Sequence, residues 1–284
     1  MGRFKRPTEV SSFRKMAAVS WDPPRDPTIY GDTEVRVDKL LAYLQQIREQ
    51  TGERVTVTHA LARAFAVLLR RHPGLNACIR RGRIWQREQV DVFIQVAVPP
   101  EGGSGLQGAD LSGAVIRNAD TKTTAQISAD LRAKAERIRK RDDPMLAATK
   151  RNLAWMPPWL MGWMLRLVSY LSHDWGISLK AFGIPDDPFG SVLVTSVGMF
   201  GIKNAYAPLF PGAKNLGIVL VGQMSDAPVV EDQKVTIGKI LPVTMTLDHR
   251  VVDGLQAAVI AREVVAMLED PEQLDAELAE HPSP

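Results

Sequence analysis

The histidine at position 249 is the residue of this chain best placed to do acid–base chemistry. It follows an alternating apolar stretch at 240–247, typical of a half-buried strand, and precedes helical apolar spacing at 255–268. A histidine at such a strand-to-helix corner has a fixed position and still meets a ligand. Asp253 stands four residues later, and Gly254 permits a tight turn or a close ligand approach. Position alone leaves two interpretations open, a general base or a structural histidine.

The residues around His249 match a known signature. The run at 248–254, Asp-His-Arg-Val-Val-Asp-Gly, resembles the motif His-x-x-x-Asp-Gly of the 2-oxoacid dehydrogenase acyltransferases, the E2 components, and of the related chloramphenicol acetyltransferase. Further blocks resemble the same family in the family's own order, and they lie at 55–66, 72–77, 96–98, 114–120 and 194–202. The resemblance extends from about Phe13 to Leu274, so the chain is similar to an E2 catalytic domain over most of its length.

The resemblance implies an acyltransferase that moves an acyl group between coenzyme A and a thiol acceptor such as a dihydrolipoyl group. His249 would be the general base that takes the thiol proton, because an imidazole ordinarily titrates near neutral pH. In the block that contains Gly198, Thr195 occupies the position of the family hydroxyl, which would donate to the oxyanion of the tetrahedral intermediate. Ser196 is the neighbouring alternative, and strand alternation allows only one of the two hydroxyls to serve.

Asp253 and Gly254 are expected to support the site. In the family, a carboxylate at the position of Asp253 pairs with an arginine near the N-terminus, for which Arg14 is the candidate. The alternative is that Arg14 is simply a surface cation. The family also places the histidine and the hydroxyl in different subunits, which implies a homotrimer with active sites between subunits. A metal site is not expected, because no Cys/His pair shows ligand spacing.

Composition indicates an ordinary globular chain. Of 284 residues, 45% are hydrophobic and 24% charged, and no Gly/Ser-rich or Pro-rich linker divides them, which favours a single domain over 1–284. The formal net charge is +3, with basic clusters at 70–71, 80–83 and 137–141. These clusters are interpreted as a solvated face or as an attraction for coenzyme A phosphates. Nucleic acid is not an expected partner, since no aromatic residues interleave the cations.

The single cysteine and the N-terminal residues bear on the compartment. Cys78 cannot form a disulfide within the chain, and its apolar surroundings favour packing over reactivity. The N-terminal residues show no apolar segment of the signal-peptide type, and no myristoylation signal. A cytoplasmic location is therefore expected.

Helical and strand patterns alternate along the chain. Helical spacing predicts helices over four segments, with Thr58 as a plausible N-cap of the second, and they lie at 35–51, 56–71, 124–141 and 255–268. Strand patterns lie at 90–98, 191–196, 216–221, 234–237 and 240–247, with a turn at 231–232. This mixture predicts an α/β two-layer sandwich, a mixed sheet covered by helices on one side. The resemblance implies that it is the chloramphenicol acetyltransferase-like fold.

The chain departs from the family pattern at three places. The lipoyl-bearing and subunit-binding domains are not found, so the chain carries no lipoyl group and would receive acyl groups on coenzyme A or from a lipoylated partner protein. The segment at 105–116, whose family counterpart borders the substrate channel, is longer and lacks a proline. A Trp-rich segment at about 145–188 has the character of an insertion. The acceptor therefore stays open.

The apolar part of that insertion, at 153–171, is short of the roughly 20 residues that span a bilayer. Trp159 and Trp163 share one face of a helix, and Trp155 precedes the Pro157-Pro158 break. Three interpretations are open. The segment is a helical hairpin packed on the domain or between subunits, a hydrophobic lid over a long acyl chain, or a site of interfacial membrane contact.

The C-terminal residues bear on the size of the assembly. The acidic, polar stretch after Leu274 is expected to dock poorly onto a neighbouring trimer, which favours a free trimer over a 24- or 60-subunit cage.

Two function classes stay open for this chain. The leading function is a coenzyme A-dependent acyltransferase that uses His249. The alternative is a catalytically inactive E2-like scaffold or assembly protein. The retained His249, Asp253 and Gly254 favour the enzyme, because a scaffold has no evident physical need for a histidine there.

Overall fold

The computed structural model describes residues 26–98, 110–139, 157–182, 184–209 and 212–280 of the 284-residue chain. The predictions for Arg14 and for the first part of the segment at 105–116 lie outside these residues. None of the helices in the described part is long and apolar enough to cross a membrane.

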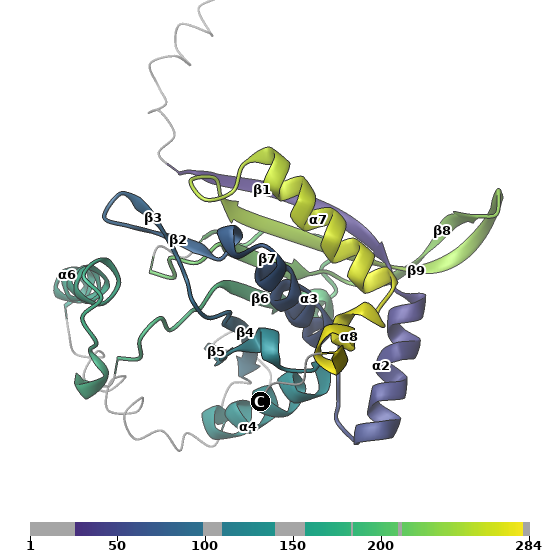
Figure 1. Cartoon of the computed structure of the whole chain (residues 1–284), viewed down its shortest axis with the longest axis horizontal. Helices are drawn as coiled ribbons and strands as arrows, with labels where there is room; N and C mark the ends of the chain where they lie inside the picture. Colours follow the sequence, from purple (N-terminus) through teal and green to yellow (C-terminus); the bar gives the residue numbers. More distant parts are fainter. Residues whose placement is uncertain (1–25, 99–109, 140–156, 183, 210–211, 281–284) are drawn as a thin grey trace, which may run out of the picture.

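A seven-stranded mixed sheet forms one layer of the molecule (Figure 1). Its strand order is β1-β9-β7-β6-β4-β5, with β8 paired to the outer part of β9. β6 runs parallel to β4 and β7, and the other pairings are antiparallel. The strands are β1 (Thr28–Arg36), β4 (Val92–Val98), β5 (Asp110–Ile116), β6 (Val192–Ser196), β7 (Gly217–Val221), β8 (Ser225–Glu231) and β9 (Lys234–Asp248), and a separate hairpin is made of β2 (Ala77–Arg80) and β3 (Arg83–Gln86).

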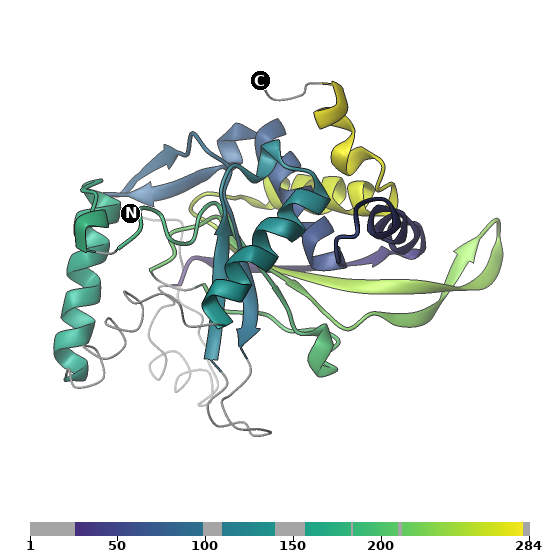
Figure 2. The ribbon, with the colours of Figure 1, turned by 90° about the horizontal axis from the view of Figure 1, so that it is seen from below.

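Helices cover one face of this sheet and form the second layer. Figure 2 shows them gathered on one side of the long strands. The helices of this layer are α2 (Asp38–Thr51), α3 (Val57–Arg71), α4 (Thr124–Arg139), α7 (Gly254–Glu269) and α8 (Gln273–Glu280), while α6 (Pro158–Ser169) lies apart from it. The short 3₁₀ helices are η1 (Pro73–Leu75), η2 (Ala119–Thr121), η4 (Lys180–Phe182) and η5 (Gly198–Phe200), and η3 (Tyr170–Asp174) is a π-helix. The predicted two-layer α/β sandwich with a mixed sheet is confirmed.

Strand alternation sorts the two faces of the sheet. Val192 and Val194 of β6 join the core beneath the helices, together with Val219 and Val221 of β7. Their chain neighbours point to the opposite face, as the two-residue period of a strand requires. Helix α3 lies deepest in the helix layer, with every residue from 59 to 69 buried.

A buried arginine ties three elements together. Arg63 of α3 is fully buried, and it donates to the carbonyl oxygens of Ala119, Asp120 and Leu274 and to the carboxylate of Asp275. A buried guanidinium is tolerated because each of these acceptors replaces a hydrogen bond to water. Arg63 therefore fixes α8 and η2 against α3.

The ribbon made by β8 and the outer part of β9 projects beyond the helix layer (Figures 1 and 2). Its turn has positive φ at Asp232 and Gln233, which agrees with the turn predicted at 231–232. Val230, Val235 and Ile237 of the ribbon are 76%, 74% and 80% exposed. The ribbon therefore presents apolar side chains to its surroundings rather than to its own domain.

The described part of the Trp-rich segment contains one α-helix, α6, that continues into the π-helix η3. The other arm of the predicted helical hairpin falls at 140–156, outside the described residues. Trp159 and Trp163 are 74% and 59% exposed, so packing of these two side chains on their own domain is not seen.

Three predicted elements differ in the structure. The strands predicted at 234–237 and 240–247 form one strand, β9. Val35 and Arg36, expected in the first helix, end β1, and α2 begins at Asp38. The N-cap of α3 is Thr56 rather than Thr58. The Thr56 side chain and the His59 side chain form a reciprocal capping box, in which His59 Nδ1 accepts from the backbone N–H of Thr56 at 2.9 Å.

The burial of His59 makes stability depend on pH. Burial lowers the pKa of His59 to about 4, well below that of an unfolded histidine. The unfolded state therefore binds the proton more readily than the folded state. The contribution of His59 to the free energy of unfolding is complete above about pH 6.5 and is lost as the pH falls towards 4.

We expect His59→Gln to remove this part of the acid sensitivity, because glutamine keeps the capping box and does not titrate. Between pH 7 and pH 5 the wild type should lose about 2 kcal/mol more of its free energy of unfolding than the variant does. Urea denaturation at the two pH values measures the difference. Equal losses in both proteins would contradict the assignment.

Candidate active site

His249 stands directly after the last residue of β9. Its backbone N–H donates to the carbonyl of Pro27 at 2.8 Å, which joins it to the chain leading into β1. Its Nδ1 lies 2.7 Å from the carbonyl oxygen of Val252. Because a carbonyl only accepts, Nδ1 carries the hydrogen, and in the neutral ring Nε2 carries a free lone pair. The side chain is exposed, so this nitrogen is accessible for proton transfer.

The two residues that flank His249 form an ion pair with each other, and this pair fixes the conformation of the corner. Asp248 is buried, and it accepts from Arg250 Nε at 2.9 Å and from the terminal guanidinium nitrogen at 2.6 Å. The backbone N–H of Arg250 donates to the same carboxylate. Hydrogen bonding to Asp248 raises the pKa of Arg250 above its ordinary value. The sequence motif contains both residues, but their role becomes visible only in the structure.

Asp253 is the N-cap of α7. Its carboxylate accepts from the backbone N–H of Gln256 at 2.8 Å, and the Gln256 side chain accepts from the backbone N–H of Asp253 at 2.9 Å. This capping box fixes where the helix begins, and thereby the position of the Val252 carbonyl that orients His249. Among the described residues no cation pairs with Asp253, and the pairing with Arg14 stays a prediction.

The two glycines of the predicted site have different surroundings. A Cβ on Gly198 would lie 2.3 Å from the carbonyl oxygen of Gly222, so the turn after β6 requires a glycine there. A Cβ on Gly254 would meet nothing within 4 Å. The space around Gly254 would therefore accept a side chain, and its φ is not positive. Close approach by a ligand stays a prediction.

Thr195 and Ser196 point to opposite faces of the sheet. Ser196 is paired in register with Val221, which faces the helices. Thr195 faces away from the helices, where it is 8% exposed. Within the described part of the chain its hydroxyl has no hydrogen-bond partner. Of the two hydroxyls, only that of Thr195 lies on the face that the helices leave uncovered.

Thr195 and His249 are far apart within one chain. Thr195 is in register with Leu220, and Leu220 with Thr244. His249 follows Thr244 by five residues, which at about 3.3 Å per residue and about 4.8 Å between strands gives a separation of roughly 15–20 Å. A single copy therefore does not bring the two side chains together.

The other candidate groups have structural surroundings. Burial raises the pKa of the Cys78 thiol, which disfavours the nucleophilic thiolate. His72 follows the last residue of α3, as predicted, and its Nε2 lies 2.6 Å from Glu263 of α7. In the described ranges no group of three or more His, Cys, Asp or Glu residues has the arrangement of a metal site.

Comparison with known families identifies the class of protein. Residues 11–143 and 186–276 match the model of the 2-oxoacid dehydrogenases acyltransferase catalytic domain. This match covers well over half of the chain, so the chain belongs to that acyltransferase family. Residues 144–185 lie between the two matched stretches, and α6 and η3 are among them.

Curated relatives carry the same domain. The dihydrolipoyllysine-residue acetyltransferase component of the pyruvate dehydrogenase complex of Zymomonas mobilis is 25% identical over 86% of this chain and 45% of that protein. The corresponding component of the acetoin cleaving system of Bacillus subtilis is 24% identical over 80% of this chain and 44% of that protein. The chain spans about half the length of the curated relatives it matches.

Solved structures share the fold. A probable dihydrolipoamide acetyltransferase of Listeria monocytogenes superposes with a TM-score of 0.60 at 18% identity, covering 94% of this chain and 95% of that one. The Azotobacter vinelandii dihydrolipoamide acetyltransferase gives 0.61 at 19% identity, covering 95% and 99%. In that enzyme a serine, a histidine and an asparagine four residues after the histidine were investigated for roles in the catalytic mechanism. The fold is therefore that of E2 catalytic cores.

The two glycines should respond differently to the same added methyl group. We expect Gly198→Ala to lower the free energy of unfolding by about 1–3 kcal/mol, because its Cβ meets the Gly222 backbone. Gly254→Ala should change it by less than about 1 kcal/mol, because its Cβ enters open space. Chemical denaturation of both variants measures the contrast. A large loss in Gly254→Ala would show that the turn itself requires this glycine.

Proposed function

We propose that the chain is a coenzyme A-dependent acyltransferase in which His249 is the general base. The observation that carries the proposal is the hydrogen bond from Nδ1 to the Val252 carbonyl, which leaves Nε2 as the proton acceptor on an exposed ring. Membership of the acyltransferase family supports it, as does the Azotobacter enzyme, in which a histidine and a residue four positions later were studied in catalysis. His249 and Asp253 have the same spacing here.

The proposed reaction begins when the acceptor thiol gives its proton to Nε2 of His249 while its sulfur attacks the thioester carbon. The carbonyl electrons move to oxygen, and a hydroxyl directed at that oxyanion stabilises it by roughly 3 kcal/mol. Thr195 supplies this hydroxyl in the proposal. The bond between carbon and the coenzyme A sulfur then breaks, and the departing thiolate takes the proton back from the imidazolium.

The site is proposed to lie between two copies of the chain. The separation of Thr195 and His249 along the sheet supports this arrangement, because a second copy would have to supply the hydroxyl. We infer a homotrimer, in which every copy gives its His249 to one site and its Thr195 to another. The cubic core of the pyruvate dehydrogenase complex, at a TM-score of 0.61, is a multimeric relative of the same fold.

Donor and acceptor are proposed by chemical class. Coenzyme A thioesters serve as donors in the proposal, and a dihydrolipoyl group on a partner protein serves as acceptor. The names of the relatives indicate a dihydrolipoyllysine residue and an acetyl group for those proteins. A reducing compartment such as the cytoplasm suits thiol substrates and the single Cys78. We further propose that residues 145–188 are an insertion into a single domain, which the unmatched stretch in the family comparison supports.

Acyl transfer from acetyl-, isobutyryl- and longer acyl-coenzyme A to dihydrolipoamide tests the function. We expect His249→Ala to lower kcat by about two to four orders of magnitude and Thr195→Val by about two. Mixed oligomers of the two inactive variants should regain about a quarter of the wild-type activity, because random assembly pairs an intact histidine with an intact threonine at that frequency.

The mixed oligomers separate the possible outcomes. No recovery of activity would place both groups in one chain, or outside the reaction. No turnover by the wild type with any donor, together with no binding of coenzyme A, would favour an inactive E2-like scaffold. Binding without turnover would indicate an intact donor site and a different acceptor.

Light scattering on the purified protein tests the assembly. Three chains of 31.3 kDa give a trimer of about 94 kDa. A mass near 31 kDa would contradict a site shared between copies. A mass near eight or twenty trimers would contradict the free trimer expected from the polar C-terminal stretch.

A further inference from the structure

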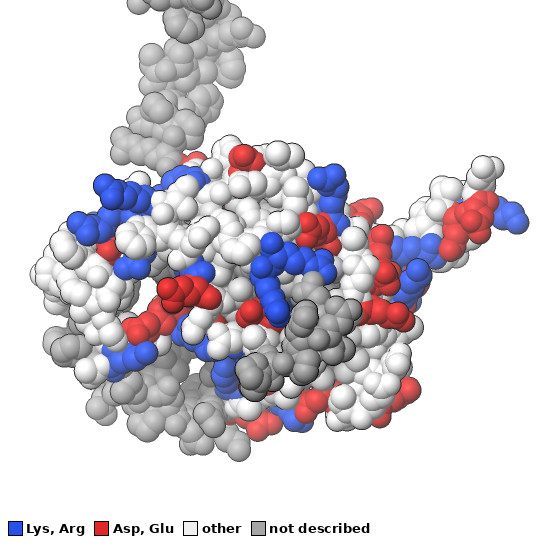
Figure 3. Space-filling view, viewed as in Figure 1, with Lys and Arg blue, Asp and Glu red and all other residues white. Residues whose placement is uncertain are grey.

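A cavity of about 1430 Å³ separates α6 and η3 from the body of the domain. Figure 3 shows this face of the molecule hollowed beside α6, with charged side chains around the hollow. The hairpin of β2 and β3 borders it on one side, and the loop leading into β6 borders it on another. Both α6 and η3 lie in the stretch 144–185, which the family model leaves unmatched.

Contacts with the hairpin hold the wall in place. His173 of η3 donates through Nε2 to the carbonyl of Ile79 at 3.2 Å. The backbone N–H of Arg81 donates to Asp174 at 3.1 Å, and the Arg81 guanidinium lies 4.3 Å from the ring centre of Trp175. The cavity is therefore enclosed by attached elements, which favours a preformed site.

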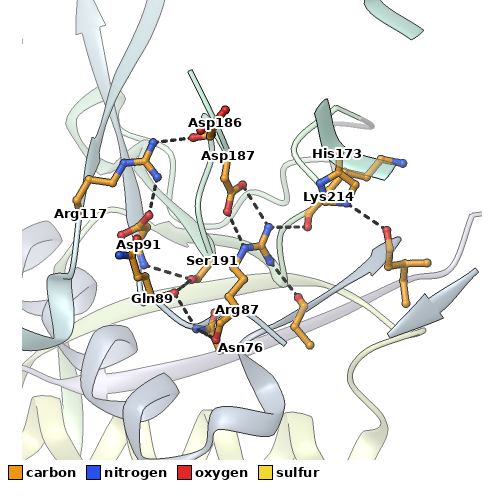
Figure 4. A network of polar contacts seen from close by, with 12 residues as sticks. Asn76, Arg87, Gln89, Asp91, Arg117, His173, Asp186, Asp187, Ser191 and Lys214 are labelled. Carbon is orange, nitrogen blue, oxygen red and sulfur yellow. Dashed lines mark hydrogen bonds and ion pairs between the residues drawn. The ribbon is translucent and has the colours of Figure 1, made fainter. Parts of the chain in front are cut away.

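Three of the carboxylates that line the cavity are already paired with cations, two of them as Figure 4 shows. Asp91 accepts from Arg117 at 2.6 Å, and Asp186 accepts from Lys180 at 2.9 Å. Asp187 accepts two hydrogen bonds from Arg87, at 2.8 and 3.3 Å. Asp174 accepts from the hairpin backbone, which leaves the exposed Glu88 as the one lining carboxylate without a partner in the described part of the chain.

Three cations face the same cavity without a carboxylate partner among the described residues. Arg80 and Lys214 are half-buried, and Arg166 lies on α6. The Arg80 guanidinium lies 5.3 Å from the centre of the Trp85 ring, and its Nε is buried and forms no hydrogen bond. Burial lowers the pKa of the adjacent His173, which keeps that ring neutral at pH 7. The cavity therefore has unused donors and a surplus of positive charge.

Apolar side chains complete the lining. Leu165, Val168 and Tyr170 belong to α6 and η3, and Ile184 and Phe189 belong to the loop leading into β6. The wall is made by residues 165–169 of α6 and 170–174 of η3, so at about 1.5 Å per residue it is roughly 15 Å long. This length accommodates an extended chain of about ten carbon atoms.

We propose that this cavity binds an amphipathic carboxylate, with its head group at Arg80 and Lys214 and its apolar body along the α6 wall. Charge-assisted hydrogen bonds from the Arg80 guanidinium and the Lys214 ammonium would hold the carboxylate. The site lies at the same end of the sheet as His249. The backbone N–H of Asp248 donates to the carbonyl of Leu216, that of Leu216 to Ser191, and that of Ser191 to Asp91 of the cavity lining. The proposal does not depend on acyl transfer, because it concerns binding alone.

Calorimetric titration of the full-length protein with decanoate tests the proposal, with decanol and decyltrimethylammonium as neutral and cationic probes of the same chain length. We expect saturable binding of decanoate and at least about tenfold weaker binding of the other two, because only decanoate matches the cations. The double variant Arg80→Gln/Lys214→Gln should bind decanoate at least about tenfold more weakly than the wild type.

The matched control is Arg83→Gln/Lys203→Gln, which removes two exposed cations outside the cavity and should bind decanoate as the wild type does. Equal affinity for decanoate and decanol would overturn the proposal on the wild type alone, even if the double variant failed to fold. Unchanged decanoate binding in a folded double variant, or no binding of decanoate to the wild type, would overturn it as well.

Discussion

The hydrogen bond from His249 Nδ1 to the Val252 carbonyl is the interaction on which the proposed chemistry depends. It selects the tautomer, and the surrounding structure keeps the carbonyl where the ring needs it. The capping box of α7 begins the helix at Gly254, and the pair of Asp248 and Arg250 holds the residues on either side of the histidine. β9, paired along its inner half with both β1 and β7, carries the corner on a rigid strand.

The same sheet that positions His249 separates it from Thr195. Thr195 lies on β6 and His249 directly follows β9, both well packed, so no modest movement within one chain closes a separation of roughly 15–20 Å. The helix-free face of the sheet, on which Thr195 lies, is where another copy would have to approach. Catalysis then requires assembly, because a complete site needs residues from two copies. A variant that weakens assembly would lose activity without any change at either residue.

Sequence alone predicted the sandwich and the corner at His249, because alternating valines in β6 and the apolar spacing of α7 are local signals. It missed β1, whose Gly31 and Asp32 interrupt the pattern and whose pairing with β9 is distant in the chain. It placed the N-cap of α3 two residues late, because His59 replaces the usual glutamate or glutamine of a capping box. The roles of Asp248 and of the cavity depend on contacts between segments that no local pattern encodes.

The ribbon of β8 and β9 has a thermodynamic consequence. A two-stranded ribbon outside a larger sheet is only marginally stable in water, and this one exposes Val230, Val235 and Ile237. The hydrogen bonds of the ribbon can therefore open locally at a lower free energy than those of the inner half of β9, without unfolding of the helix layer.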